Sequence, residues 1–140
     1  MKTLTIKDKI KKQIEKEINS RKEIIFAYIF GSFAEIEHTS SYSYNDIDIT
    51  IYIDEKNEIK DVFYEINLSN KLEEMVKIPV DIIRLNNASD VLIYRATQGI
   101  LIKNIDDNLR INFITISWKK YWDFQKLLKE HLLELKSGNR

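Results

Sequence analysis

The sequence predicts an α/β (α+β) fold, in which a mixed β-sheet of about four strands is flanked by helices. Short apolar runs of strand length alternate along the chain with longer stretches of helical period. The chain has 140 residues, of which 44% are hydrophobic, and a chain of this size can bury a real core. We therefore expect residues 1–140 to form a single domain that ends in a long C-terminal helix.

The first helix is predicted over about residues 5–21, because isoleucines recur every four residues among lysines and glutamates, at Ile6, Ile10, Ile14 and Ile18. Residues 23–30 form a nearly continuous apolar run, which is typical of a buried central strand. Gly31 and Ser32 end that strand, and a glycine there allows backbone to approach a ligand closely. Residues 37–45 are polar and are predicted to be a loop.

The next predicted element is a strand over 46–53, in which isoleucines alternate strictly with Asp46, Asp48, Thr50 and Tyr52. The pattern then predicts, in order, a helix over 56–76, a strand over 80–85, a helix over 88–98 capped by Gly99, a strand over 100–103 and a helix over about 106–136. A cluster of four aromatic residues in this last helix is expected to face the core or a partner: Trp118, Tyr121, Trp122 and Phe124.

Composition excludes several classes of protein. The chain has no cysteine and only two histidines, His38 and His131, which argues against disulfides and against a zinc site built on several histidines. The 22 basic and 22 acidic residues leave no overall positive field for a nucleic acid. No apolar run is long enough to span a membrane, and the N-terminus lacks the apolar core of a signal peptide. We expect a soluble cytoplasmic protein with no membrane or direct nucleic-acid partner.

Three aspartates form the candidate site. Asp46 and Asp48 are two residues apart on one predicted strand, so both project from the same face. Two bare carboxylates 4 Å apart repel by roughly 4 kcal/mol at an effective dielectric of about 20, and hard oxygen ligands suit Mg²⁺ or Mn²⁺. Asp81 lies in another apolar strand and would complete the cluster from a neighbouring position. The residues alone leave two other interpretations open, a solvated polar face and pairing of Asp81 with Arg84 or a lysine.

These residues resemble the nucleotidyltransferase superfamily of the DNA polymerase β type. Its signature is a strand followed by Gly-Ser, then Asp-x-Asp on the next strand, then a third acid on a later strand. The matching segments are Gly31-Ser32, Asp46-Ile47-Asp48 and Val80-Asp81. The small size and the run over 99–102 look like the minimal nucleotidyltransferases (MNT), which partner HEPN ribonuclease toxins as antitoxins. The resemblance covers about residues 22–104.

The resemblance implies a nucleotidyltransferase fold and the transfer of AMP from ATP to a tyrosine of a cognate HEPN toxin, which this modification neutralises. Asp46, Asp48 and Asp81 are then the catalytic residues and the ligands of two Mg²⁺ ions, for which Mn²⁺ can substitute. Gly31 and Ser32 are then nucleotide-binding residues. The implied partners are ATP and the toxin, and the resemblance leaves homo-oligomers and hetero-oligomers open.

The chain departs from the family pattern just after the Gly-Ser turn. The family usually has a basic residue and a glycine there, whereas this chain has Glu35 and Ile36. Because a glutamate near a triphosphate repels it, this departure favours an antitoxin that is catalytically weak and acts by binding through its C-terminal helix. A second alternative keeps the chemistry and changes the acceptor to a small molecule, as in the aminoglycoside nucleotidyltransferases.

Overall fold

The computed structural model describes residues 5–35, 46–57 and 62–137, so the predicted loop over 37–45, with His38, lies outside the described residues. The elements in chain order are α1 (Ile6–Asn19), β1 (Ile24–Phe30), α2 (Ser32–Glu35), β2 (Ile47–Ile53), the 3-10 turn η1 (Glu55–Asn57), α3 (Tyr64–Val76), β3 (Val80–Arg84), α4 (Asp90–Ala96), β4 (Ile100–Asn104) and α5 (Asp107–Lys136). None of the helices in these residues is long and apolar enough to cross a membrane.

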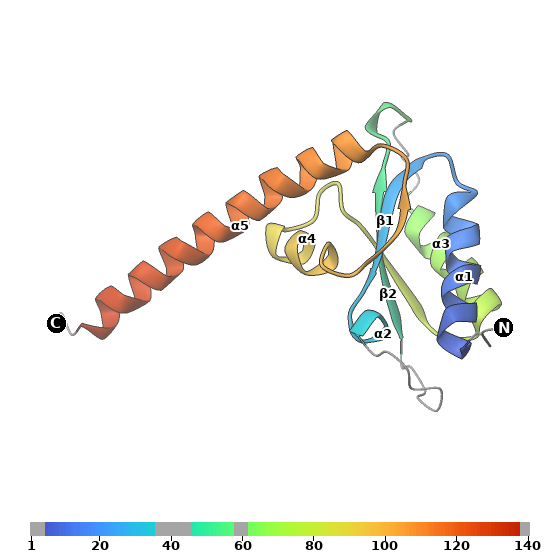
Figure 1. The fold of residues 1–140 in the computed structure, drawn as a ribbon, viewed down its shortest axis with the longest axis horizontal. Coiled ribbons are helices and arrows are strands. Elements are labelled where there is room, and N and C mark those ends of the chain that lie inside the picture. The colour runs from blue at the N-terminus through green and yellow to red at the C-terminus, as the bar shows by residue number, and fades with distance from the viewer. Residues whose placement is uncertain (1–4, 36–45, 58–61, 138–140) are drawn as a thin grey trace.

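The four strands form one mixed sheet in the order β3-β2-β1-β4. β1 pairs antiparallel with β2 and with β4, whereas β2 and β3 run parallel. All seven residues of the interior strand β1 are buried, in agreement with its continuous apolar run. The predicted fold class is confirmed, since helices flank this sheet and α5 forms a long C-terminal helix (Figure 1).

α1 and α3 cover one face of the sheet (Figure 1). Thr5 and Asp8 form a capping box that starts α1, in which each side chain accepts a hydrogen bond from the backbone of the other residue. The predicted isoleucine stripe of α1 then packs with α3 on the alternate isoleucines of β2; the buried residues of this layer include Ile10, Ile14, Ile18, Leu68, Leu72, Val76, Ile47, Ile49, Ile51 and Ile53. Burial of each such side chain contributes about 1.5–3 kcal/mol, so this layer stabilises the fold.

α4 and the first half of α5 cover the opposite face, where aromatic and aliphatic side chains pack together. The rings of Phe26 and Tyr52 stack with their centroids 4.9 Å apart, and Phe113 of α5 meets Tyr52 at 5.0 Å. Thr50 and Tyr52 are buried, although in sequence they continue the face of the strand that carries the carboxylates. Only Asp46 and Asp48, at the start of that face, remain outside this second core.

The long helix α5 projects well beyond the rest of the fold (Figure 1). Its middle part still packs on α4: the rings of Tyr94 and Tyr121 stack with centroids 4.0 Å apart, and the Trp118 indole donates a 2.8 Å hydrogen bond to Thr97. Trp122 and Phe124 are both 55% exposed. Trp118 and Tyr121 therefore pack inside this chain, Trp122 contacts the Tyr94 ring edge-on while half of it stays exposed, and Phe124 is exposed.

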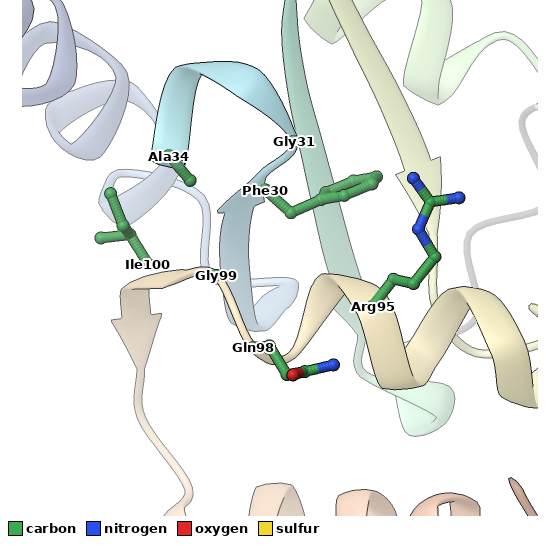
Figure 2. Close-up of a pocket in the computed structure, with 7 residues that line it drawn as sticks. All are labelled: Phe30, Gly31, Ala34, Arg95, Gln98, Gly99 and Ile100. Carbon is green, nitrogen blue, oxygen red and sulfur yellow. The ribbon is translucent and has the colours of Figure 1, made fainter. Parts of the chain in front are cut away.

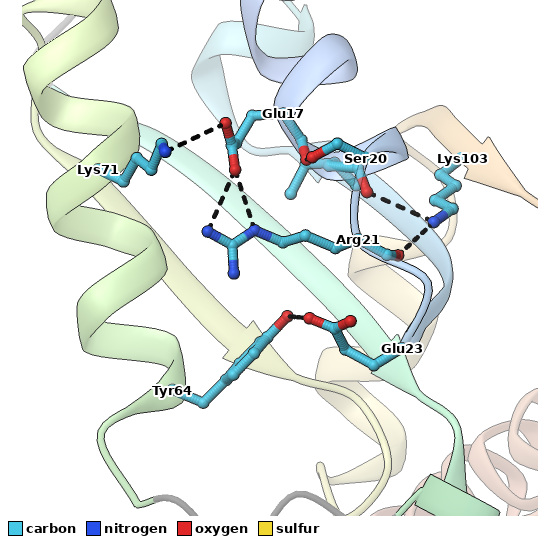
Figure 3. A network of polar contacts seen from close by, with 8 residues as sticks. Glu17, Ser20, Arg21, Glu23, Tyr64, Lys71 and Lys103 are labelled. Carbon is cyan, nitrogen blue, oxygen red and sulfur yellow. Dashed lines mark hydrogen bonds and ion pairs between the residues drawn. The ribbon is translucent and has the colours of Figure 1, made fainter.

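A polar network ties the end of α1 to its neighbours (Figure 3). The buried Lys103 of β4 donates a 2.6 Å hydrogen bond to the carbonyl of Arg21, whose guanidinium pairs with Glu17. The Tyr64 hydroxyl at the start of α3 donates to Glu23. Burial, together with that hydrogen bond to a carboxylate, raises the pKa of Tyr64 to about 12.

Two predictions about helix ends are wrong. The helix predicted over 56–76 begins only at Tyr64, after the 3-10 turn η1 at Glu55–Asn57. Gly99 does not cap α4, because the cap is Thr97 in a right-handed conformation. A Cβ atom at position 99 would lie 2.1 Å from the carbonyl oxygen of Ile29, so Gly99 is needed for close packing against β1.

Candidate functional site

The turn after β1 requires its glycine. Gly31 has a φ of +78°, a left-handed conformation that L-residues rarely adopt. A Cβ atom on Gly31 would lie 2.6 Å from Oδ2 of Asp48, so the carboxylate would have to move. Ser32 follows at the start of α2 with an exposed side chain. The backbone of this turn therefore lies close to the Asp48 carboxylate, and its predicted close approach to a ligand stays a prediction.

The three predicted aspartates gather at one edge of the sheet. Asp48 of β2 lies directly across from Phe30 of β1 on one side and from Asp81 of β3 on the other. Residues opposite each other on neighbouring strands project from the same face, so both carboxylates stand on the face that α4 covers further along. Asp46 comes just before β2 and is exposed, as is Asp81, whereas Asp48 is half-buried.

The electrostatics of Asp48 show that these carboxylates influence one another. Burial raises the pKa of Asp48, and the negative charges of Asp46 and Asp81 raise it further. The positive charge of Arg95 on α4 opposes them and is the smallest of the four effects. Asp48 therefore lies in a negative field, which a divalent cation would relieve.

The donor set suits a hard divalent cation. Within the residues that the structure describes, the carboxylates of Asp46, Asp48 and Asp81 form no ion pair, and Arg84, the alternative partner of Asp81, pairs with Glu65. All three offer oxygen ligands of the kind that Mg²⁺ and Mn²⁺ prefer. Yet no three His, Cys, Asp or Glu side chains of the described part stand close enough together to hold an ion as placed. The three aspartates thus fit a divalent cation by their chemistry and by the register of their strands, but as placed they do not form a complete coordination shell.

A cavity of about 290 Å³ adjoins the Gly31 turn, between the end of β1 and the end of α4 (Figure 2). Its lining residues are Phe30, Gly31, Ala34, Arg95, Gln98, Gly99 and Ile100. The sequence analysis missed Arg95, which lies 47 positions after Asp48, in a predicted helix with no motif around it. The only feature of the sequence that could have indicated Arg95 is its position four residues before Gly99, and Gly99 was predicted to cap the helix.

The sequence matches the family described as polymerase beta nucleotidyltransferase over residues 12–108. This chain belongs to that family. The match spans both strands that carry the aspartates, together with the Gly31 turn and Arg95, so the site described above is part of the nucleotidyltransferase domain. Among curated proteins, none matches the sequence of this nucleotidyltransferase.

Solved structures share the fold of this nucleotidyltransferase. A mutant of the MntA-HpeT toxin–antitoxin superposes with a TM-score of 0.68 at 20% identity, over 90% of this chain and 98% of that one. A tri-AMPylated HEPN toxin from Shewanella oneidensis in complex with an MNT antitoxin gives 0.62 at 21%, over 90% and 98%. A toxin–antitoxin with AMP-PNP gives 0.64 at 20%, over 91% and 97%. The common architecture therefore extends over nearly the whole chain.

Proposed function

We propose that this nucleotidyltransferase is an antitoxin that transfers AMP from ATP to a tyrosine of a cognate HEPN toxin. The observation that carries the proposal is the pairing of Asp48 with Asp81 across two parallel strands, beside the glycine turn at Gly31. The fold shared with MNT antitoxins, one of them in complex with a tri-AMPylated toxin, supports the choice of acceptor.

In the proposed reaction the acceptor hydroxyl oxygen forms a bond to the α-phosphorus of ATP, the bond from that phosphorus to the bridging oxygen breaks, and pyrophosphate leaves. Asp81, exposed at the sheet edge, accepts the proton of the hydroxyl. The backbone of Gly31 and the hydroxyl of Ser32 hold the terminal phosphates. Magnesium held by Asp46, Asp48 and Asp81 would supply charge neutralisation of the triphosphate and a more acidic acceptor hydroxyl.

The proposal is tested by incubating the chain with ATP labelled at the α-phosphate, Mg²⁺ and the purified cognate HEPN toxin. We expect label on the toxin, its loss after toxin Tyr→Phe substitution, and a rate about 10²–10³-fold lower for Asp81→Asn. Glu74→Gln, an exposed carboxylate on α3 behind the sheet, is the matched control and should transfer normally. Label on an aminoglycoside and none on the toxin would favour the small-molecule alternative.

A second candidate function, neutralisation by binding alone, is favoured by the distal half of α5. We define the distal α5 surface as its exposed large apolar residues, which are Trp122, Phe124, Leu127, Leu128, Leu132, Leu133 and Leu135. Leu128, Leu132 and Leu135 continue, at helical spacing, the stripe that Ser117 and Tyr121 present to α4. Exposed apolar patches of this kind mark protein interaction sites.

We propose that the toxin docks on the distal α5 surface, because the stripe of α5 residues that packs on α4 extends beyond α4 and is exposed there. Leu128→Glu together with Leu132→Glu should then weaken toxin binding by at least tenfold, since each buries a charge in an apolar contact. Glu130→Gln, on the polar side of the same turns, is the control. Normal neutralisation by Asp81→Asn, with loss in the leucine variant, would establish binding as the mode of action; the reverse result would establish catalysis.

A further inference from the structure

Among the residues that the structure describes, Arg95 is the only charged one in the lining of the 290 Å³ cavity beside the Gly31 turn. Its side chain leaves α4 and extends past the ring of Phe30, the residue that pairs with Asp48 across the sheet (Figure 2). The guanidinium is exposed and, among the residues that the structure describes, forms no hydrogen bond or ion pair. A planar group with five donors is thus presented to the cavity with none of them used inside the fold.

The surroundings of this guanidinium favour an anion. Gly31 and Gly99 line the same cavity, and neither has a side chain that would hold a ligand away from the backbone. Gln98 adds an exposed amide at the rim. The Asp48 carboxylate lies next to Gly31 at the rim of the cavity, and Asp81 lies across from Asp48 on the neighbouring strand. A ligand that extends from the cavity to these carboxylates would meet Arg95 on one side and any cations that the carboxylates hold on the other. A polyphosphate meets both requirements.

We propose that Arg95 binds the terminal phosphates of the nucleotide and so supplies, from α4, the positive charge that the turn after Gly31 lacks. That short helix carries no basic residue in its last turn and has Glu35 at the position where the family usually has a basic one. The inference rests on the proposed nucleotidyl transfer and deepens it, since the cation comes from a different element of the fold and the departure at Glu35 then no longer implies a weak site.

Arg95 also has a structural role in α4, which the test must distinguish from phosphate binding. It lies in the last turn of α4, where a positive charge interacts favourably with the helix dipole. Lys16 likewise lies in the last turn of its helix, α1, on the opposite face of the sheet, and is exposed. Lys16→Ala therefore removes the same charge from the same kind of helix end without touching the cavity, which makes it a matched control for Arg95→Ala.

The experiment is calorimetric titration of the full chain with ATP, tripolyphosphate and AMP at fixed Mg²⁺. We expect Arg95→Ala to weaken the binding of ATP and tripolyphosphate about 10–100-fold and that of AMP less than threefold, with partial recovery in Arg95→Lys and no change in Lys16→Ala. Thermal unfolding of each variant shows that it is folded.

Three results overturn the proposal, and they are distinguishable. If the unaltered chain binds none of the three ligands, the proposed nucleotidyl transfer fails and the role of Arg95 falls with it. If the unaltered chain binds ATP and Arg95→Ala binds it equally well, the proposed function stands and this inference is wrong. If Arg95→Ala weakens AMP and ATP to the same extent, Arg95 does not contact the terminal phosphates.

Discussion

The two faces of the sheet differ in what covers them and in what they leave open. The face under α1 and α3 is closed by aliphatic side chains along the length of β2. The face under α4 and α5 is closed by aromatic rings over Thr50 and Tyr52 but stops short of Asp48. The same strand therefore contributes to a sealed core on one side and, on the other, changes within two residues from core to a negatively charged site.

This difference shows how a small chain separates stability from chemistry. The aliphatic face can bury its side chains fully because nothing on it has to meet a ligand. The aromatic face ends early, at the edge where Asp48, Asp81 and the Gly31 turn meet, and leaves a cavity there. Changes on the first face should therefore alter unfolding and leave nucleotide chemistry intact, whereas changes at the open edge of the second should alter nucleotide chemistry.

The largest expected effect is at that open edge. Asp48→Asn should lower AMP transfer by about 10²–10³-fold, measured with labelled ATP and the toxin. Its stability at neutral pH should equal or exceed that of the unaltered chain. Folding raises the pKa of Asp48 above its ordinary 3.8, so the folded state disfavours the ionised carboxylate. The stability of the unaltered chain therefore falls as pH rises through the folded pKa, and the uncharged Asn removes this cost. A variant that is both inactive and clearly less stable would contradict the separation of the two faces.

The opposite result is expected on the aliphatic face. Leu72 of α3 is fully buried, and Leu72→Ala should lower the free energy of unfolding by about 2–5 kcal/mol through the cavity that it leaves. ATP affinity, measured by calorimetry at a temperature where the variant is folded, should stay within about twofold of the unaltered value. Denaturant titration gives the first quantity. Loss of ATP binding by folded Leu72→Ala would show that the two faces are coupled.

A smaller effect is expected for backbone conformation, with opposite signs on the two sides. Gly31→Ala should cost about 1–2 kcal/mol from the positive φ alone, and its Cβ should also displace the Asp48 carboxylate and reduce transfer. Lys77, which ends α3 with a φ of 60°, is the contrasting position: Lys77→Gly should be neutral or stabilising by up to about 1 kcal/mol. Equal effects of the two changes on transfer would refute the assignment of the Gly31 turn.

The smallest effect concerns the polar network behind the sheet. Tyr64→Phe removes the hydrogen bond to Glu23 and should cost about 1 kcal/mol with no effect on transfer. Because folding raises the pKa of Tyr64 from 10.0 to about 12, its contribution is present below pH 10 and is lost as pH rises through about 12. In an ultraviolet titration, the most alkaline ionisation of a tyrosine should therefore be absent from Tyr64→Phe. An unchanged titration would mean that another tyrosine is responsible.

Much of this architecture could be predicted from periodicity. The isoleucines spaced every four residues predict α1, and the alternation after Asp46 predicts β2 together with the common face of its two carboxylates. The placement of β3 beside β2, which brings Asp81 across from Asp48, was expected from a lone acid in an apolar strand. These features are local or follow from pairing rules, so sequence patterns reveal them. The catalytic and binding roles of these residues stay predictions.

The features that sequence did not reveal depend on tertiary packing. Tyr52 is buried because Phe113 of α5, far along the chain, packs on its ring. Gly99 is needed because the carbonyl of Ile29 approaches it closely. Arg95 reaches the site only because the end of α4 packs beside the end of β1. Sequence periodicity does not reveal such contacts, and a residue such as Arg95, which belongs to no motif, can be assigned to the site only from the fold.

The most direct test of the central claim is a titration of Mn²⁺ in the presence of ATP, followed by paramagnetic resonance, with the unaltered chain, Asp48→Asn and Asp81→Asn. If carboxylates from β2 and β3 share one cation site, each single substitution should weaken Mn²⁺ binding at least tenfold, and Glu74→Gln should leave it unchanged. Undiminished binding by Asp81→Asn would mean that the two strands do not build a common site, and the proposed chemistry would be contradicted.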